Sequence, residues 1–169
     1  SIGNDYFRSY AERSGFEGNR IDKYLTVALG AIEVTPYQLV GAYGAFANGG
    51  YRIDPYLITK VVDRDGKTIL QAQPRKAGDE KNRIITKDNA AMVDSLLKGV
   101  VRGGTARAAQ ALGRSDIAGK TGTTNDSVDA WFAGYQPNLV GVAWMGFDTG
   151  NKSLGASEFG GGLELPSWM

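Results

Sequence analysis

Three short segments near the end of the chain constrain the fold most. Residues 117–124, 130–135 and 140–147 carry β-branched and aromatic residues between turn signals, which is typical of strands. The turns that separate them, at Asn125-Asp126 and Pro137-Asn138, are short. Parallel neighbours need a crossover of about a dozen residues, whereas short turns join antiparallel strands. The sequence therefore predicts an antiparallel sheet in the last third of the chain.

Helices are predicted ahead of this sheet. An amphipathic pattern over residues 4–14 predicts a helix that Asn4 caps and Gly15 ends. Thr35-Pro36 is a capping residue followed by proline at the first helical position, and it predicts a second helix that stops at Asn48-Gly49-Gly50. Small residues in that helix should let a neighbouring segment approach closely, namely Gly41, Ala42, Gly44, Ala45 and Ala47.

Two further caps and a hairpin complete the expected elements. Thr86 predicts the start of a helix over residues 87–101, and Thr105 the start of a short alanine-rich helix that ends at Gly113. Residues 56–63 and 67–71 predict a hairpin around Asp65-Gly66, followed by a surface loop at 73–81. Residues 150–162 read as a glycine-rich loop. With no internal repeat or boundary, residues 1–169 are predicted to form one α+β domain, a mainly antiparallel sheet packed with helices.

Composition excludes several classes of chemistry. The chain has no Cys and no His, so it contains no Ser-His or Cys-His nucleophile pair and no Cys or His metal site. Any acid–base chemistry must use Lys, Asp, Glu or Tyr. The net charge is +1 and the positive residues are scattered, so we expect no binding to nucleic acid. No apolar run approaches the ~18 residues of a membrane helix, so no direct membrane contact is expected.

The motif Lys120-Thr121-Gly122-Thr123 is the sharpest chemical signal. Gly119-Lys120-Thr121 also matches the end of a nucleotide-binding P-loop, but that motif requires glycine where this sequence has Arg114, and it requires a helix directly afterwards. The other interpretation is the Lys-Thr-Gly box of active-site serine acyltransferases. An ordinary surface strand would also accommodate the tripeptide, so the motif alone leaves this interpretation open.

The residue types suit an acyltransferase cleft. An edge strand can pair with an extended peptide, and Gly122 lets an acyl group come close because it lacks a side chain. Lys120 supplies positive charge, and Thr121 and Thr123 offer hydroxyl groups to a carboxylate. A backbone N–H after the box can stabilise an oxyanion.

The sequence around the motif resembles class A penicillin-binding proteins over nearly the whole chain. The segments that carry the resemblance are residues 28–36, 45–50, 101–106, 120–126, 129–135, 142–148, 158–161 and 166–168. The resemblance implies the penicillin-binding-protein/β-lactamase-like transpeptidase fold, of which this chain would be the C-terminal portion. It also implies a D-alanyl-D-alanine transpeptidase that cross-links peptidoglycan stem peptides and is acylated by β-lactams.

The same resemblance implies roles for five residues. Lys120 would act in catalysis, and the N–H of Thr123 would form half of the oxyanion hole. Thr121, Gly122, Thr123 and Phe159 would bind substrate. No metal or cofactor is implied. The partners would be the D-Ala-D-Ala stem peptide and β-lactam antibiotics. The parent protein would also carry a membrane helix and a glycosyltransferase domain, and would lie on the periplasmic face of the inner membrane.

Two boxes of the family are missing from this sequence. The nucleophile box S-x-x-K and the second box S-x-N precede the first helix predicted here, so the chain is expected to start after them. Ser95-Leu96-Leu97-Lys98 matches S-x-x-K literally but falls in the middle of a predicted helix, whereas a nucleophile is expected at a helix start. We interpret Ser95 as structural, and Trp131 and Tyr135 as sheet packing. A carboxypeptidase, a β-lactamase relative, a β-lactam sensor and a non-catalytic penicillin-binding domain remain alternatives.

Overall fold

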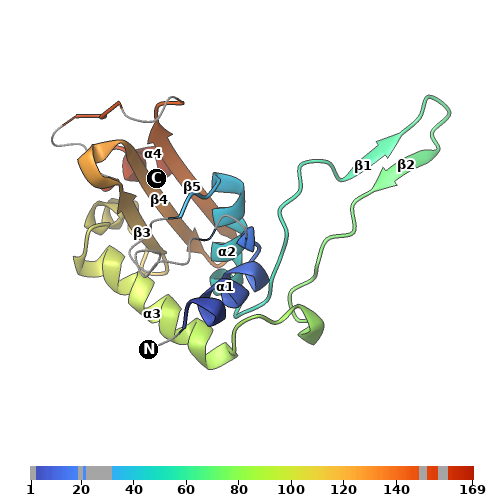
Figure 1. The fold of residues 1–169 in the computed structure, drawn as a ribbon, viewed down its shortest axis with the longest axis horizontal. Coiled ribbons are helices and arrows are strands. Elements are labelled where there is room, and N and C mark those ends of the chain that lie inside the picture. The colour runs from blue at the N-terminus through green and yellow to red at the C-terminus, as the bar shows by residue number, and fades with distance from the viewer. Residues whose placement is uncertain (1–2, 19–20, 22–31, 149–151, 156–159) are drawn as a thin grey trace.

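A computed structural model describes residues 3–18, 21, 32–148, 152–155 and 160–169 (Figure 1). The described helices and strands follow along the chain in the order α1 (Asn4–Arg13), α2 (Pro36–Ala47), β1 (Lys60–Val62), β2 (Thr68–Gln71), η3 (Glu80–Asn82), α3 (Lys87–Gly103), η4 (Arg107–Leu112), β3 (Ala118–Thr123), η5 (Asn125–Ser127), β4 (Asp129–Gln136), β5 (Leu139–Gly146) and α4 (Glu164–Trp168). The predicted α+β class is confirmed.

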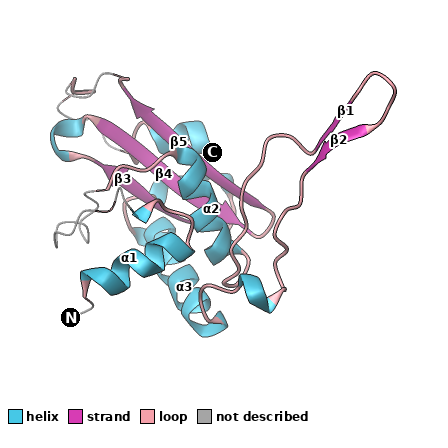
Figure 2. Cartoon of the chain, turned by 45° about the vertical axis from the view of Figure 1, so that its right-hand side comes forward, coloured by secondary structure: helices cyan, strands magenta, loops and turns pink. Residues whose placement is uncertain are grey.

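The central sheet is the predicted antiparallel one, with strand order β3-β4-β5 (Figure 2). Its register pairs Lys120 with Ala133, and Trp131 with Trp144. The β3–β4 turn is tight because Asp126 and Ser127 both adopt positive φ, at 62° and 52°. Thr124 holds this turn with its hydroxyl, which accepts the N–H of Asp129 at 2.7 Å.

Helices pack against both faces of the sheet. Phe132 is fully buried on one face, where its ring meets Trp168 of α4 edge-on at 5.0 Å. Val101, Ala106, Ala109, Ile117 and Leu165 complete that core. Tyr135 lies on the opposite face, because residues of opposite parity in a strand point to opposite sides. Its ring meets Tyr43 of α2 at 6.5 Å, and its hydroxyl donates to Asp94 of α3 at 3.1 Å. Tyr135 is therefore packing, as predicted.

The small residues of α2 do admit a close neighbour. The helix begins at Thr35 with a complete capping box, in which Thr35 and Gln38 exchange side-chain and backbone hydrogen bonds. A Cβ on Gly44 would lie 2.9 Å from the side chain of Ile53, and one on Gly41 would lie 3.2 Å from Pro55. The absence of side chains at these two positions therefore gives the chain that leaves α2 room to fold back along the helix.

Hairpin β1–β2 projects away from the body of the molecule (Figures 1 and 2). All residues of its two strands are exposed. The predicted first strand, residues 56–63, is wrong at its start, because pairing begins only at Lys60. Ala72 still donates its N–H to Thr59, but Pro74, two residues further on, has no N–H with which to continue the ladder.

Two predicted caps are also wrong. Asn4 is the first residue inside α1, and the capping position is Gly3, which makes no side-chain cap bond. The alanine-rich segment forms η4, a 3₁₀ helix whose capping position is Ala106. The Thr105 side chain does not cap this helix and instead contacts Thr121, as described under the candidate active site. Helix α3 runs to Gly103, two residues beyond the predicted end, with Thr86 as its cap as predicted.

The protein should lose stability at high pH, because the pKa values of Tyr43 and Tyr135 are raised. Burial raises the pKa of Tyr43 from 10.0 to about 12. Burial also raises the pKa of Tyr135, with a further contribution from the Asp94 carboxylate. Because the folded-state pKa of Tyr43 lies above its unfolded value, its contribution is fully present below pH ~10 and is lost as the pH rises through about 12.

Melting temperatures measured between about pH 9 and pH 12 should therefore fall less steeply for Tyr43→Phe than for the unchanged protein. At about pH 7 the two proteins should melt at nearly the same temperature, which is the control for packing. If the melting temperatures of the two proteins fell in parallel over the whole alkaline range, the pKa of Tyr43 would not be raised in the folded protein.

Candidate active site

The Lys-Thr-Gly motif lies on the edge strand of the sheet. Among the described residues β3 pairs only with β4, so its other edge is open. The N–H of Thr124 donates to Asp129 across the β3–β4 pair at 3.0 Å, and such bonds recur at every second residue of an antiparallel strand. Gly122 therefore turns its main-chain groups toward β4, whereas Thr121 and Thr123 turn theirs toward the open edge.

Lys120 brings positive charge to this open edge. Its side chain is exposed, and its ammonium group donates to the carbonyl of Thr121 at 2.7 Å. The same nitrogen lies 3.5 Å from the Thr121 hydroxyl oxygen. A cation and a hydroxyl group thus meet at one point of the edge, an arrangement suited to binding an anion such as a carboxylate.

The Thr121 hydroxyl has a second partner that the sequence analysis missed. Thr121 is buried, with 9% of its surface exposed, and its Oγ1 lies 2.6 Å from Oγ1 of Thr105. Thr105 stands in the turn between α3 and η4, 16 residues earlier in the chain. The only signal in the sequence was the segment of residues 101–106, where we interpreted Thr105 as a helix cap.

The C-terminal turn reaches the other end of the motif. The N–H of Gly160 donates to the Thr123 hydroxyl at 3.2 Å. A Cβ on Gly160 would collide with the carbonyl oxygens of Trp131 and Gly122, so only glycine fits there. Thr123 itself is exposed. Phe159, the remaining predicted site residue, lies outside the described residues, as do residues 28–31 of the resembling segment.

Gly122 and Gly119 of β3 differ sharply in their surroundings. A Cβ on Gly122 would make an ordinary contact with the Cβ of Trp131, at 3.4 Å. A Cβ on Gly119 would lie 2.6 Å from the ring of Phe132 and 2.8 Å from the carbonyl oxygen of Ala133. Gly119 is therefore required for packing, whereas Gly122 has room on its own side of the sheet.

The S-x-x-K match at Ser95-Leu96-Leu97-Lys98 has no catalytic geometry. Ser95 is exposed on the third turn of α3. The ammonium group of Lys98 is held by the Asp94 carboxylate at 2.7 Å, one turn earlier in the same helix. Lys98 therefore pairs with a carboxylate instead of activating Ser95. The P-loop interpretation is also wrong, because the residues after Lys120 continue as strand β3.

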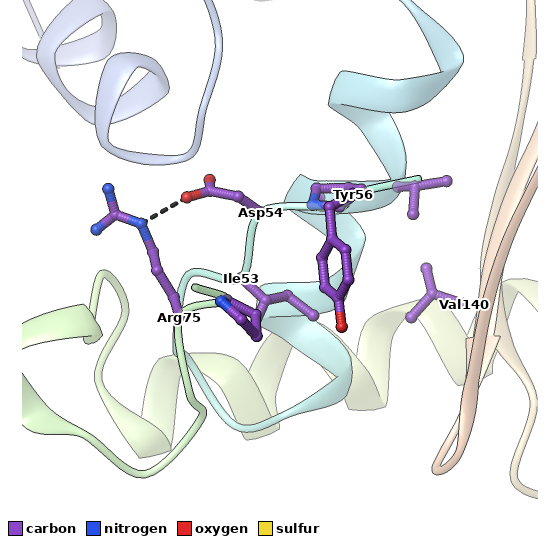
Figure 3. A pocket seen from close by; sticks show the side chains of 9 residues that line it. Ile53, Asp54, Tyr56, Arg75 and Val140 are labelled. Carbon is purple, nitrogen blue, oxygen red and sulfur yellow. Dashed lines mark hydrogen bonds and ion pairs between the residues drawn. The ribbon is translucent and has the colours of Figure 1, made fainter. Parts of the chain in front are cut away.

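A cavity of about 370 Å³ is lined by the residues drawn in Figure 3. It is mainly apolar and is formed by α2, the segment that follows it and the start of β5, with Ile53, Tyr56 and Val140 among its walls. At its rim Asp54 forms ion pairs with Arg75, at 2.5 Å, and with Arg52, at 2.8 Å. Burial alone would raise the pKa of Asp54, but the two guanidinium groups hold it below its usual value. The cavity contains no residue of the Lys-Thr-Gly motif.

Two classes of site are not found in the part of the chain that the structure describes. No group of three or more His, Cys, Asp or Glu side chains there is placed to hold a metal ion. Within the same residues, no helix combines the length and the apolar character needed to cross a membrane.

Comparison with known proteins agrees with the fold. The model of the penicillin binding protein transpeptidase domain family matches residues 1–157. Penicillin-binding protein 1A of Neisseria gonorrhoeae is 46% identical over 169 residues, which are 100% of this chain and 21% of that protein. The chain thus spans a minor part of this relative.

Solved structures of penicillin-binding proteins are also similar to this chain. The crystal structure of penicillin-binding protein 1A from Haemophilus influenzae is 34% identical, with a TM-score of 0.86, and the match covers 98% of this chain and 30% of that one. The penicillin-binding protein PonA1 from Mycobacterium tuberculosis is 25% identical, with a TM-score of 0.80, over 98% of this chain and 47% of that one. Because the family model covers residues 1–157, which is most of the sequence, this chain belongs to the penicillin-binding protein transpeptidase domain family.

Proposed function

We propose that this chain is the C-terminal part of a D-alanyl-D-alanine transpeptidase domain that cross-links peptidoglycan stem peptides. The observation that carries the proposal is the set of groups at the open edge of β3, where the Lys120 ammonium lies within 3.5 Å of the Thr121 hydroxyl. A stem peptide that ends in D-Ala-D-Ala presents an extended backbone and a terminal carboxylate. The strand edge can pair with the backbone, and the cation and hydroxyl groups can bind the carboxylate.

The reaction would proceed through an acyl-enzyme. A serine upstream of this chain attacks the carbonyl of the penultimate D-Ala, the terminal D-Ala leaves as its amine is protonated, and an amine of a second stem peptide then displaces the serine. A β-lactam would acylate the same serine by opening its ring.

Each residue of the motif has a role in this scheme. Lys120 stabilises negative charge near the serine and assists proton transfer. Thr121 and Thr123 bind the terminal carboxylate, and Gly122 leaves space for the acyl group. The outward N–H of Thr123 would donate to the oxyanion, a contribution that is typically large because the donor is already oriented. Phe159 would line the cleft.

The complete protein would contain more than this domain. We propose that it carries the nucleophile box and S-x-N box upstream, together with a glycosyltransferase domain and a single membrane helix. The transpeptidase domain would then act on the periplasmic face of the inner membrane, where peptidoglycan is assembled.

The direct test is acylation by a fluorescent penicillin, followed on a denaturing gel. The full-length protein should become covalently labelled, and the 169-residue chain alone should not, because it lacks the nucleophile box. Ser95→Ala in the full-length protein should leave the labelling unchanged. Labelling of the short chain that disappears with Ser95→Ala would refute the structural role of Ser95, and an unlabelled full-length protein would refute the proposed function.

A further inference from the structure

The Thr105–Thr121 pair joins two parts of the fold at the edge of the candidate site. The two hydroxyl oxygens lie 2.6 Å apart, which is a short hydrogen bond in which either oxygen could be the donor. Thr121 is 9% exposed, and Thr105 is exposed. Thr105 therefore contacts the motif through a side chain, from a turn that contributes no residue to β3.

The numbers of hydrogens that the Thr105 and Thr121 hydroxyl groups can donate decide which of the two must be the donor if Thr121 is to bind a carboxylate. A hydroxyl group has one hydrogen to donate and can accept two hydrogen bonds. The Lys120 ammonium group can only donate, and so it adds a hydrogen to Thr121 Oγ1 rather than accepting one. An ionised carboxylate can only accept. Thr121 can therefore bind a carboxylate through its hydroxyl only if its own hydrogen is not already directed at Thr105.

The turn that carries Thr105 is fixed on both sides. Gly104 donates its N–H to Val100 at 2.9 Å, and a Cβ there would lie 2.9 Å from the backbone of Val100, so the tight end of α3 requires glycine. Ala106 is fully buried in the core next to Val101. The side chain of Gln110 donates to the carbonyls of Val101 and Arg102, at 3.1 Å and 2.7 Å. Thr105 is thus held between anchored residues, and its hydroxyl position is set by the fold.

We propose that Thr105 is a positioning residue for carboxylate recognition, an inference that rests on the proposed transpeptidase function. Thr105 donates its hydroxyl hydrogen to Thr121 Oγ1, which leaves the Thr121 hydrogen directed at the carboxylate of the substrate. The ligand class is an acyl donor with a free terminal carboxylate. A chain of hydrogen bonds in one direction also polarises its members, so each strengthens the next.

The test compares two acyl donors on the full-length protein. One is a peptidyl thioester that ends in a free carboxylate, and the other is the same thioester with that carboxylate esterified. Thr105→Val removes the hydroxyl group and keeps the branched shape. We expect it to reduce the second-order rate constant for acylation by the carboxylate donor about tenfold, since a hydrogen bond to a charged group is affected. The rate with the esterified donor should change by less than about twofold.

Thr105→Ser is the matched control, because it keeps the hydroxyl group on a smaller side chain. It should restore the rate with the carboxylate donor to within about threefold of the unchanged protein. Thr105→Ala is a second truncation that should behave as Thr105→Val does. Melting temperatures of all three variants, compared with the unchanged protein, separate a local effect on Thr121 from damage to the turn.

Two results would overturn the role of Thr105. Equal rates for Thr105→Val and the unchanged protein with the carboxylate donor would show that the hydroxyl pair does not orient Thr121. An equal loss with both donors would show that Thr105 supports the strand as a whole and not carboxylate recognition. Labelling of the unchanged protein by fluorescent penicillin is measured in the same preparation, and its absence would instead refute the proposed function.

Discussion

Lys120→Ala should reduce the rate of acylation by a β-lactam roughly 10²-fold or more in the full-length protein, the size of effect seen when one preorganised electrostatic group is removed. The ammonium group of Lys120 lies at the open edge of β3, where it donates to the Thr121 carbonyl at 2.7 Å. In the proposed reaction, charge at this place would stabilise the transition state more than the ground state, because negative charge would develop there during acylation. The side chain is exposed, so its removal should leave the melting temperature nearly unchanged.

The measurement is the time course of labelling by a fluorescent penicillin at several concentrations. Lys67→Ala is the control, since Lys67 is an exposed lysine in the β1–β2 hairpin, away from the motif. Labelling by Lys67→Ala should match the unchanged protein. If Lys120→Ala labels within a few-fold of the unchanged protein but melts at a much lower temperature, Lys120 is structural and the candidate site is misplaced.

Gly119→Ala should lower the melting temperature by several degrees, whereas Gly122→Ala should leave it nearly constant. Both glycines lie in β3, three residues apart. The methyl group of the first would meet the Phe132 ring at 2.6 Å and the Ala133 carbonyl at 2.8 Å, and neither can move, because the ring is fully buried and the carbonyl belongs to β4. Overpacking of this kind costs about 1–3 kcal/mol. The methyl group of the second meets only the Trp131 Cβ, at 3.4 Å.

The variants Gly119→Ala and Gly122→Ala also distinguish a role in packing from a role in the approach of the substrate. Gly122→Ala should slow acylation if the acyl group comes close to that position, while its stability is retained. Thermal unfolding and penicillin labelling are measured on both variants of the full-length protein. Equal melting temperatures for the two variants would contradict the packing difference. A Gly122→Ala protein with unchanged acylation would make this residue a tolerant strand position.

Local patterns in the sequence were sufficient for most of the elements. Thr35-Pro36 predicts the start of α2 correctly because a capping residue and a proline act within a single turn. The three strands of the sheet and their antiparallel order follow from β-branched and aromatic residues between short turns, which also depend only on neighbouring residues. Element ends were less predictable. Residues 56–58 have the composition of a strand, yet they lie outside the β1–β2 ladder, and Pro74 on the opposite side has no N–H to extend it.

The candidate site was predicted in part. Lys120, Thr121, Gly122 and Thr123 were singled out from a short motif and its surroundings, and they lie on β3, which pairs on one side only among the described residues. Thr105 and Gly160 were not identified as parts of the site, although each contacts a threonine of the motif. Thr105 was instead predicted to cap a helix, since capping is the local role that a threonine before an alanine-rich segment suggests.

The sequence by itself determined the helices α1, α2 and α3, the three strands of the sheet, the class of fold, and the strand that carries the motif, because each of these depends on patterns within a few residues. Helix α4 was not predicted. Only the tertiary structure decided that Thr105 reaches Thr121 across 16 residues and that Gly160 reaches Thr123 across 37 residues. It also decided that Gly119, and not Gly122, is the glycine that the Phe132 ring requires. Contacts of this kind depend on how separate elements pack against one another, and periodicity along one element carries no information about the neighbour it will meet.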